Sequence, residues 1–304
     1  MKVFTKEYLR KLHKPAWDSS GEDNGSVTII GGSSLFHGAP ILALKAASRI
    51  VDMVFFASPE PSLSSVVSKL KASLSSFIWV PWEEVDAYIE KSDAVLIGPG
   101  MMRYAHESRI KNNELPPFAK ATRGKQITDY DEEGNKTRGI TERLLLKFPH
   151  KRWVIDAGSL QTMDADWIPP RAIITPNSKE FSILFGEKIY DLRFKIHEFS
   201  KIVQKMAKEN DCIIVAKGSE TVVASPEDVV IIRGGNPGLT KGGSGDVLAG
   251  LTVALLAKND PFLAACAASY IVKAAADELY SKVGTNYNSD DLAEKIPETL
   301  HETN

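Results

Sequence analysis

Hydrophobic residues along the chain fall into short continuous runs, and longer segments with helical spacing lie between them. Each run is rich in β-branched residues and bounded by Gly, Pro or Asp; the runs are VTII at 27–30, MVFFA at 53–57, AVLIG at 94–98, RWVID at 152–156, RAIIT at 171–175 and CIIVA at 212–216. Runs that are apolar throughout are typical of parallel strands buried on both faces. The intervening segments predict helices over 39–51, 61–71, 141–148, 178–185 and 196–209. This alternation predicts an α/β fold with a mainly parallel sheet and helices on both faces.

The pattern changes in the second half of the chain. Two apolar runs within 221–234 flank Ser225-Pro226-Glu227-Asp228, which predicts a hairpin. Helices are expected at 245–257 and 261–281. The charged stretch 103–140 contains Pro116-Pro117 and interrupts the alternation, so we interpret it as an insertion carrying a hairpin or a mobile loop. We expect residues 1–304 to form a single domain around this insertion.

Composition and charge exclude several classes of protein. The 304 residues include 37 Lys and Arg against 39 Asp and Glu, which gives a net charge of −2 and no basic surface for nucleic acid or an anionic membrane. Cys212 and Cys266 lie in apolar stretches, as expected of core thiols in a reducing compartment. The N-terminal residues lack the apolar run of a signal peptide, and no apolar stretch reaches membrane-spanning length. We therefore expect a cytoplasmic protein.

A glycine-rich turn carries the clearest chemical signal. Gly242, Gly243 and Gly245 lie within four positions and directly precede a small-apolar helical segment. Glycines there let the backbone turn tightly and direct several N–H groups outward. These groups lie at the N-terminus of the following helix, which is the positive end of its dipole. The sequence therefore predicts an anion site that can hold a phosphate without a basic side chain. Neither the P-loop pattern nor the G-x-G-x-x-G dinucleotide pattern is present.

Asp246 stands beside this predicted anion site. A carboxylate next to a phosphate is repelled by it. Its presence there is explained if it accepts the proton of a hydroxyl that attacks the phosphoryl group. The alternative is an ordinary acidic residue in the first turn of a helix. The surrounding glycines and Asn236-Pro237-Gly238 favour the first interpretation.

The segment GNPGLTKGGSGDVLAG at 235–250 closely resembles the signature of the ADP/ATP-dependent NAD(P)H-hydrate dehydratases, a family within the ribokinase-like superfamily. Further stretches agree with that family in order and spacing: residues 27–50, IGPGM at 97–101, VIDAGSL at 154–160, TPNSKEFSILFG at 175–186 and AKGSETVVA at 216–224. The resemblance covers about residues 25 to 300, apart from the predicted insertion. It implies a ribokinase-like fold of three layers.

The resemblance also implies a reaction that repairs hydrated NADH and NADPH. Phosphorylation of the hydroxyl on the reduced ring turns a poor leaving group into a good one, and elimination of phosphate restores NAD(P)H. Such an enzyme is a lyase in outcome and a kinase in mechanism. Its co-substrate would be ADP or ATP, with Mg²⁺ as cofactor.

Residue roles follow from the matching positions. Asp246 would be the base that contacts the hydroxyl of the hydrated cofactor. The phosphate in transfer would be held by the amides of Gly243, Ser244 and Gly245. The adenine nucleotide would be bordered by Lys217, Gly218, Ser219, Glu220, Thr221 and Gly245, and the hydrated cofactor by Ala39, Gly100, Asn177 and Asp246.

Asn177 and Glu180 form an N-x-x-E pattern with two interpretations. In the wider superfamily this pattern organises Mg²⁺ and its waters near the phosphates, consistent with the hard oxygen ligands that Mg²⁺ prefers. The same spacing also marks a helix N-cap with its capping Glu. The two interpretations are compatible, and both stay open at this point.

The chain departs from the family at two places. Asn177-Ser178-Lys179-Glu180 stands where the family usually has His-Pro-Gly-Glu, and Gly158 replaces a second Asp that tends to follow the position of Asp156. Asp156 itself ends a predicted buried strand, where it could contact a ligand or cap a turn.

Two other functions compete with the dehydratase. One is a ribokinase-like kinase that phosphorylates a vitamin precursor or sugar; the other is a nucleotide-binding regulator without catalysis, for which the carboxylate of Asp246 would be superfluous. The resemblance further implies a homo-oligomer. Because no epimerase domain precedes residue 25, any epimerase is expected to be a separate protein.

Overall fold

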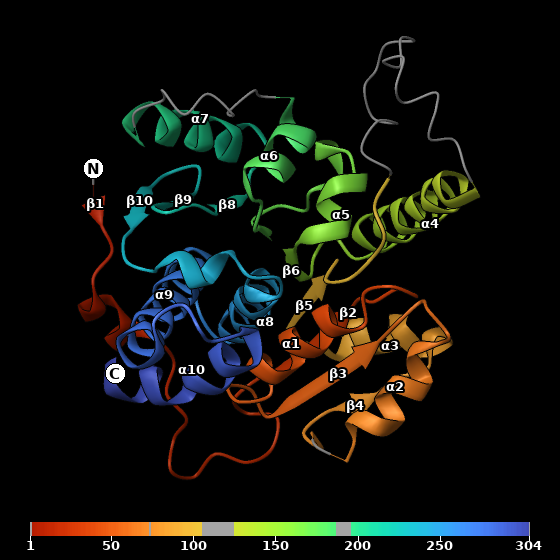
Figure 1. The fold of residues 1–304 in the computed structure, drawn as a ribbon, viewed down its shortest axis with the longest axis horizontal. Helices are drawn as coiled ribbons and strands as arrows, with labels where there is room; N and C mark the ends of the chain where they lie inside the picture. The colour runs from red at the N-terminus through yellow and green to blue at the C-terminus, as the bar shows by residue number, and fades with distance from the viewer. Residues whose placement is uncertain (1, 73, 105–124, 187–195, 304) are drawn as a thin grey trace.

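The computed structural model describes residues 2–72, 74–104, 125–186 and 196–303, apart from the side chains of 125–131 and 303. In this part of the chain the strands form one sheet in the order β1-β10-β9-β8-β7-β6-β5-β2-β3-β4 (Figure 1). Neighbouring strands are parallel except that β9 is antiparallel to both β8 and β10. The strands are β1 (Lys2–Val3), β2 (Ser26–Ile30), β3 (Met53–Ala57), β4 (Ile78–Trp79), β5 (Ala94–Ile97), β6 (Arg152–Ile155), β7 (Ile173–Ile174), β8 (Ile213–Ala216), β9 (Thr221–Ala224) and β10 (Val229–Ile232).

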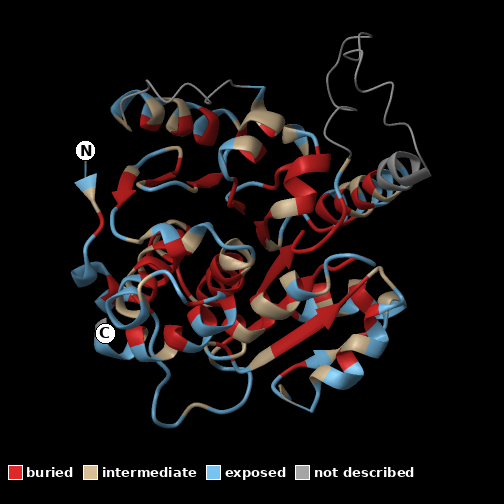
Figure 2. Cartoon of the chain, viewed as in Figure 1, coloured by how far each residue is buried: buried red, intermediate tan, exposed pale blue. Residues whose placement is uncertain are grey.

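Helices cover both faces of the sheet, so two hydrophobic cores form (Figure 2). The first face carries α1 (Gly38–Ala47), α2 (Leu63–Leu70), α8 (Ser244–Leu256), α9 (Pro261–Val283) and α10 (Ser289–Thr303). The second carries α3 (Val85–Lys91), α4 (Lys125–Lys147), α5 (Ala157–Thr162), α6 (Ser178–Phe185) and α7 (Ile196–Glu209). Side chains alternate between the cores along the central strands; Ile29 of β2 enters the first core and Ile30 the second.

The predicted fold class is confirmed, as are all six strands, the hairpin of β9 and β10, and the helices at α1, α2, α6, α7, α8 and α9. The short elements β4, α3 and α5 and the amphipathic α10 were not predicted, because two to seven residues carry little periodicity and α10 is largely polar.

The interpretation of 103–140 as a hairpin or loop is wrong for its second half. Helix α4 begins at Lys125 and runs through the whole of 125–140. Its inward side is built from Thr137 and Thr141 as well as Leu144, so the apolar periodicity that marks a helix is missing from its first turns. Residues 105–124 lie outside the described part of the chain.

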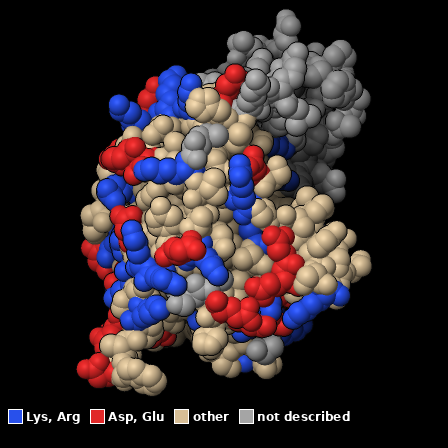
Figure 3. Space-filling view, turned by 90° about the vertical axis from the view of Figure 1, so that its left-hand side faces the viewer, with Lys and Arg blue, Asp and Glu red and all other residues tan. Residues whose placement is uncertain are grey.

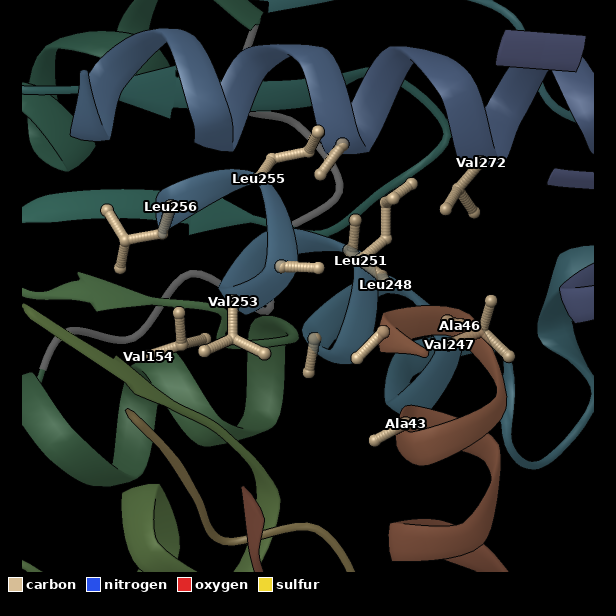
Figure 4. Close-up of a cluster of buried hydrophobic side chains, with 14 of the residues drawn as sticks. Ala43, Ala46, Val154, Val247, Leu248, Leu251, Val253, Leu255, Leu256 and Val272 are labelled. Atoms are coloured by element: carbon tan, nitrogen blue, oxygen red, sulfur yellow. The ribbon is translucent and has the colours of Figure 1, made fainter. Parts of the chain in front are cut away.

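Helix α8 is the central element of the first face. Every residue from Val247 to Leu256 is buried, and its side chains contact α1, α9 and β6 (Figure 4). A Cβ at Gly250 would lie 2.3 Å from the carbonyl oxygen of Ala43 in α1, so the two helix backbones touch. A helical segment that is apolar on all sides is stable only when it is buried in the protein interior. This contact fixes where the N-terminus of α8 lies.

The chain changes direction in the sheet between β2 and β5. From β2 it continues outward to β3 and β4, whereas from β5 it continues the opposite way to β6, β7 and β8. In open parallel sheets such a reversal leaves a crevice beyond the carboxyl ends of the two strands, where ligands bind. The turn at 31–37 and the residues from Gly98 to Met101 border this crevice.

Basic and acidic side chains are interspersed on the face of the molecule drawn in Figure 3. The charge balance of the whole chain is therefore also a local balance on this face. Among the described helices, none has the length and apolar run that crossing a membrane requires.

The contact of α1 with α8 predicts a strong effect of one methyl group. Gly250→Ala is expected to lower the free energy of unfolding by about 1–3 kcal/mol, because the added Cβ overlaps the Ala43 backbone. Urea denaturation measures this change. The matched control is Gly139→Ala in α4, where no atom lies within 4 Å of the new Cβ. The control is expected to raise stability by about 0.5–1 kcal/mol through helix propensity, so equal effects of the two substitutions would contradict the packing argument.

Candidate functional site

Four side chains converge beyond the carboxyl ends of the central strands. Asp156 directly follows β6 and Lys217 directly follows β8, while Glu180 lies in the first turn of α6, after β7. Asp246 lies in the first turn of α8, which enters from the first face. Segments that are far apart in the sequence thus place three carboxylates around one ammonium group.

Lys217 links the carboxylates. Its Nζ lies 3.0 Å from Oδ1 of Asp156 and 3.6 Å from Oε2 of Glu180. The side chain of Lys217 is 20% exposed, whereas those of Asp156 and Glu180 are 2% and 6% exposed. Burial disfavours the charge on Lys217, but the two carboxylates outweigh it and raise the pKa above the ordinary lysine value. Lys217 is therefore a fixed positive charge.

The carboxylate partners of Lys217 are themselves held in place. The hydroxyl of Thr175 donates to Oδ1 of Asp156 over 2.7 Å, and Nε2 of Gln161 donates to Oε1 of Glu180 over 3.2 Å. Burial raises the pKa of Glu180, and Lys217 opposes that rise. The two carboxylates that bind the ammonium group are thus fixed by further hydrogen bonds. Buried ion pairs need such bonds to offset the cost of removing both charges from water.

Asp246 is the group in this cluster that can exchange a proton near neutral pH. Burial and then the charge of Asp156 raise the pKa of Asp246 to about 7, with Glu180 adding to the rise and Lys217 opposing it. A general base works best when its pKa lies near the working pH. The surroundings of Asp246 therefore suit it to accept and return a proton.

The glycine-rich turn places α8 amides next to Lys217. Gly243 has φ 95°, and a Cβ there would lie 2.4 Å from Leu42 and 2.8 Å from the Ser289 hydroxyl. The Ser244 hydroxyl donates to the Leu239 carbonyl over 2.7 Å, which holds the turn. A Cβ at Gly245 would lie 3.4 Å from Nζ of Lys217. The first N–H groups of a helix have no acceptor within it, so amides and ammonium together form an anion site.

A cavity of about 610 Å³ opens beside this anion site. It is lined by Asn177, Lys217, Gly218, Ser219, Thr221, Gly234, Gly235, Asn236, Pro237, Leu239, Thr240, Ser244, Gly245, Leu248, Ser269, Val272 and Lys273. Most residues assigned to the nucleotide thus share one cavity. Glu220 does not line it, because its carboxylate accepts a hydrogen bond from Nε of Arg233 on the surface.

Ala39 and Gly100 lie together in the crevice between β2 and β5. Gly100 has φ 70°, and a Cβ there would lie 3.2 Å from Cβ of Ala39 and 2.4 Å from the carbonyl oxygen of Phe36. Only glycine fits this close approach of two backbones. Two of the four positions assigned to the hydrated cofactor are therefore neighbours, and neither lines the 610 Å³ cavity, whereas a third, Asn177, does line it.

Comparison with known proteins identifies the family. A family model described as NAD(P)H-hydrate dehydratase matches residues 132–298. The bifunctional NAD(P)H-hydrate repair enzyme of Methanocaldococcus jannaschii is 32% identical in an alignment that covers 96% of this chain. This chain belongs to the NAD(P)H-hydrate dehydratase family.

Family members of two lengths match this chain. It spans about half the length of the bifunctional relatives, 51% in the M. jannaschii enzyme. The ADP-dependent (S)-NAD(P)H-hydrate dehydratase of Cenarchaeum symbiosum is 28% identical, and the match covers 93% of this chain and 91% of that protein.

Solved structures show the same fold. The ADP/ATP-dependent NAD(P)H-hydrate dehydratase of Bacillus subtilis, co-crystallized with ATP/Mg²⁺, has a TM-score of 0.75 at 21% identity, covering 100% of this chain and 99% of that one. The ribokinase-like fold predicted from the sequence is thereby confirmed.

The structure tests the capping roles that the sequence suggests for Asn177, Glu180 and Asp156. Asn177 and Glu180 form a capping box: Oδ1 of Asn177 accepts from the Lys179 and Glu180 N–H groups, and Oε2 of Glu180 accepts from the Asn177 N–H. Asp156 does not cap its turn with its side chain, since its carboxylate is bonded to Thr175 and Lys217 instead.

The departure from the family at Gly158 has a packing reason. A Cβ there would lie 2.2 Å from the carbonyl oxygen of Met101. The segment after Gly100 therefore occupies the space that an aspartate side chain would need. Any substitution at Gly158 has to displace the border of the crevice.

Lys273 of α9 is a site residue that the sequence reasoning missed. It lines the cavity and is only 6% exposed. A signal was present, because Lys273 is a single charge inside the apolar stretch 261–276. Charged side chains are rarely buried without specific partners.

The raised pKa of Asp246 predicts a stability change with pH. The pKa of Asp246 is about 7 in the folded protein and near 3.8 in the unfolded chain. Ionisation of this carboxyl group therefore lowers the free energy of unfolding. The cost is absent below the unfolded pKa, grows between the two values and is constant above pH 7. Asp246→Asn is therefore expected to raise the free energy of unfolding at pH 8 and to change it little at pH 4. Urea titrations at both pH values measure this, and a gain that is the same at both would contradict it.

Proposed function

We propose that this chain dehydrates hydrated NADH and NADPH with ADP or ATP as phosphoryl donor. The proposal is carried by the position of Asp246, whose pKa is about 7, in the first turn of α8 beside the ammonium group of Lys217. A base and an anion site within one helix turn suit the transfer of a phosphoryl group to a hydroxyl. The names of the shorter family members, such as that of C. symbiosum, support the substrate class.

The proposed chemistry has two steps. In the first, the ring hydroxyl of the hydrated cofactor gives its proton to Asp246 while its oxygen attacks the terminal phosphorus, and the bond from that phosphorus to the nucleotide breaks. In the second, the ring nitrogen donates electron density, the carbon–oxygen bond breaks and phosphate leaves. Loss of a ring proton then restores NAD(P)H.

We assign binding roles to the other residues of the site from their positions in the cavity, the anion site and the crevice. The adenine nucleotide would occupy the 610 Å³ cavity, with its terminal phosphate at the amides of Gly243, Ser244 and Gly245. Lys217 would stabilise negative charge on the transferred group. The hydrated ring would lie beside Ala39 and Gly100, at the border of the crevice beyond β2 and β5.

The residues of the site do not fit a directly bound Mg²⁺ ion. Oδ1 of Asn177 accepts two backbone N–H groups, and both carboxylate oxygens of Glu180 are bonded to Asn177, Lys217 or Gln161. Within the described residues, no three His, Cys, Asp or Glu side chains could hold a metal ion. We therefore propose that Mg²⁺ arrives on the phosphates of the nucleotide and meets Asn177 and Glu180 only through water.

We propose the following setting for the enzyme. It would work in a homo-oligomer, in the cytoplasm, with residues 1–304 forming one ribokinase-like domain.

An activity assay tests the proposed function. Purified protein, hydrated NADH, MgCl₂ and either ADP or ATP are expected to regenerate NADH, followed by its absorbance. Asp246→Ala is expected to slow the reaction by a factor on the order of 10²–10⁴, the usual contribution of a general base. If the wild-type protein binds ADP but restores no NADH, the dehydratase proposal is wrong. Release of a stable phosphorylated product from a sugar or vitamin precursor would then indicate a small-molecule kinase.

The rate should depend on pH through Asp246. Only the ionised carboxylate accepts a proton, so kcat/KM is expected to rise with pH and to level off above an apparent pKa near 7. Lys217→Met removes the positive charge that lowers the Asp246 pKa, and should move this rise to higher pH as well as reduce the rate. A profile whose midpoint is the same in both proteins would show that another group is the base.

A further inference from the structure

The walls of the 610 Å³ cavity come from separate parts of the chain. One wall is the turn from Lys217 to Thr221 between β8 and β9, and another is the segment from Gly234 to Thr240 that follows β10. Helix α9 lies behind both walls and contributes Ser269, Val272 and Lys273. The two walls are joined at their bases, where Thr221 pairs with Ile232 in the β9–β10 ladder and Nε of Arg233 donates to the Glu220 carboxylate over 3.0 Å. Further from the sheet, their spacing also depends on the helix behind them.

Lys273 bonds both walls at once. Its Nζ donates to the carbonyl oxygens of Gly218 over 3.2 Å, Ser219 over 2.6 Å and Gly234 over 2.9 Å. An ammonium group has three N–H donors, and here each can have one carbonyl acceptor. Burial lowers the pKa of Lys273, and the nearby carboxylates of Asp277 and Glu220 oppose that change.

Asp277, one helical turn further along α9, completes the arrangement. Its carboxylate accepts from the Gly235 N–H over 2.8 Å and from Nδ2 of Asn236 over 3.1 Å. Gly234 and Gly235 have φ of 94° and 80°, so this turn has a conformation that favours glycine and has no side chains of its own to hold it. Lys273 thus binds a carbonyl group and Asp277 an N–H group of the same glycine turn.

We infer that Lys273 is a positioning residue for the nucleotide: by joining Gly218 and Ser219 to Gly234, it sets the width of the cavity that receives the base and ribose. This inference rests on the proposed function only in that the cavity must take a nucleotide. Because the ammonium group binds all three carbonyls, it holds them at fixed positions along the cavity wall. The cluster of Asp156, Glu180, Lys217 and Asp246 does not include Lys273, so replacement of Lys273 removes none of its charged groups.

The test is the affinity for ADP, measured by calorimetry in the presence of MgCl₂. Lys273→Met keeps the length of the side chain but removes the charge and all three donors, and is expected to raise the Kd by about tenfold or more. The KM for ADP should rise with it, whereas kcat at saturating ADP should not change. Lys273→Arg keeps the charge, but its planar guanidinium cannot direct three N–H groups at converging carbonyls, so an intermediate Kd is expected.

Lys295→Met is the matched control. Lys295 is another buried lysine, 7% exposed and 2.8 Å from Glu278, but it does not line the cavity. Its replacement should lower thermal stability and leave the Kd for ADP unchanged. If Lys295→Met weakens ADP binding as much as Lys273→Met does, the effect is one of general stability and the inference is wrong.

The outcomes separate the inference from the proposed function. A wild-type protein that does not bind ADP contradicts the proposed function itself. A wild-type protein that binds ADP, together with an unchanged Kd in folded Lys273→Met, contradicts only the role of Lys273. Should Lys273→Met fail to fold, Lys273→Arg decides, and a Kd equal to that of the wild type overturns the inference.

Discussion

The backbone contact between α1 and α8 is the constraint on which the site depends. Gly250 lets α8 approach Ala43 without a side chain between them, so a helix that is buried from Val247 to Leu256 reaches the middle of the sheet. From there its N-terminus lies at the carboxyl ends of β6 and β8, next to Asp156 and Lys217. An anion site made of amides is effective only where it is fixed, because its strength depends on oriented dipoles rather than on a mobile charge. The packing of the core thus determines the electrostatics of the site.

The charges at the site are arranged so that one of them can change. Lys217 is ion-paired with Asp156 and Glu180, and those two carboxylates are hydrogen-bonded by Thr175 and Gln161. Asp246 forms no such ion pair among the described residues, and burial, followed by repulsion from Asp156 and Glu180, raises its pKa to near neutrality. Fixed neighbours therefore make the proton affinity of Asp246 a property of the whole cluster.

The sequence predicted the parts of the molecule that have a local signature. Buried strands, the β9–β10 hairpin and the glycine-rich turn before α8 each depend on residues close together in the chain. Helix α4 was only partly recognised, because threonines occupy much of its inner side. The roles of Asp156 and Lys273 depend on partners distant in the sequence, such as Lys217 for the first and Gly234 for the second. No spacing rule predicts such contacts, although a lone lysine in an apolar helix indicates that one exists.

The order of strands in the sheet has a consequence for how the chain folds. Lys2 and Val3 pair with Val230 and Ile231. On the first face, α8 covers β2, β5 and β6, and α9 covers β8, β9 and β10, although both helices come late in the sequence. During synthesis, most of the first apolar sheet face is therefore made long before the helices that bury it. Contacts so distant in sequence slow folding, and uncovered apolar surface promotes aggregation. Helix α8, which holds the candidate site in place, is thus also an element whose late synthesis leaves the first sheet face uncovered until α8 is made.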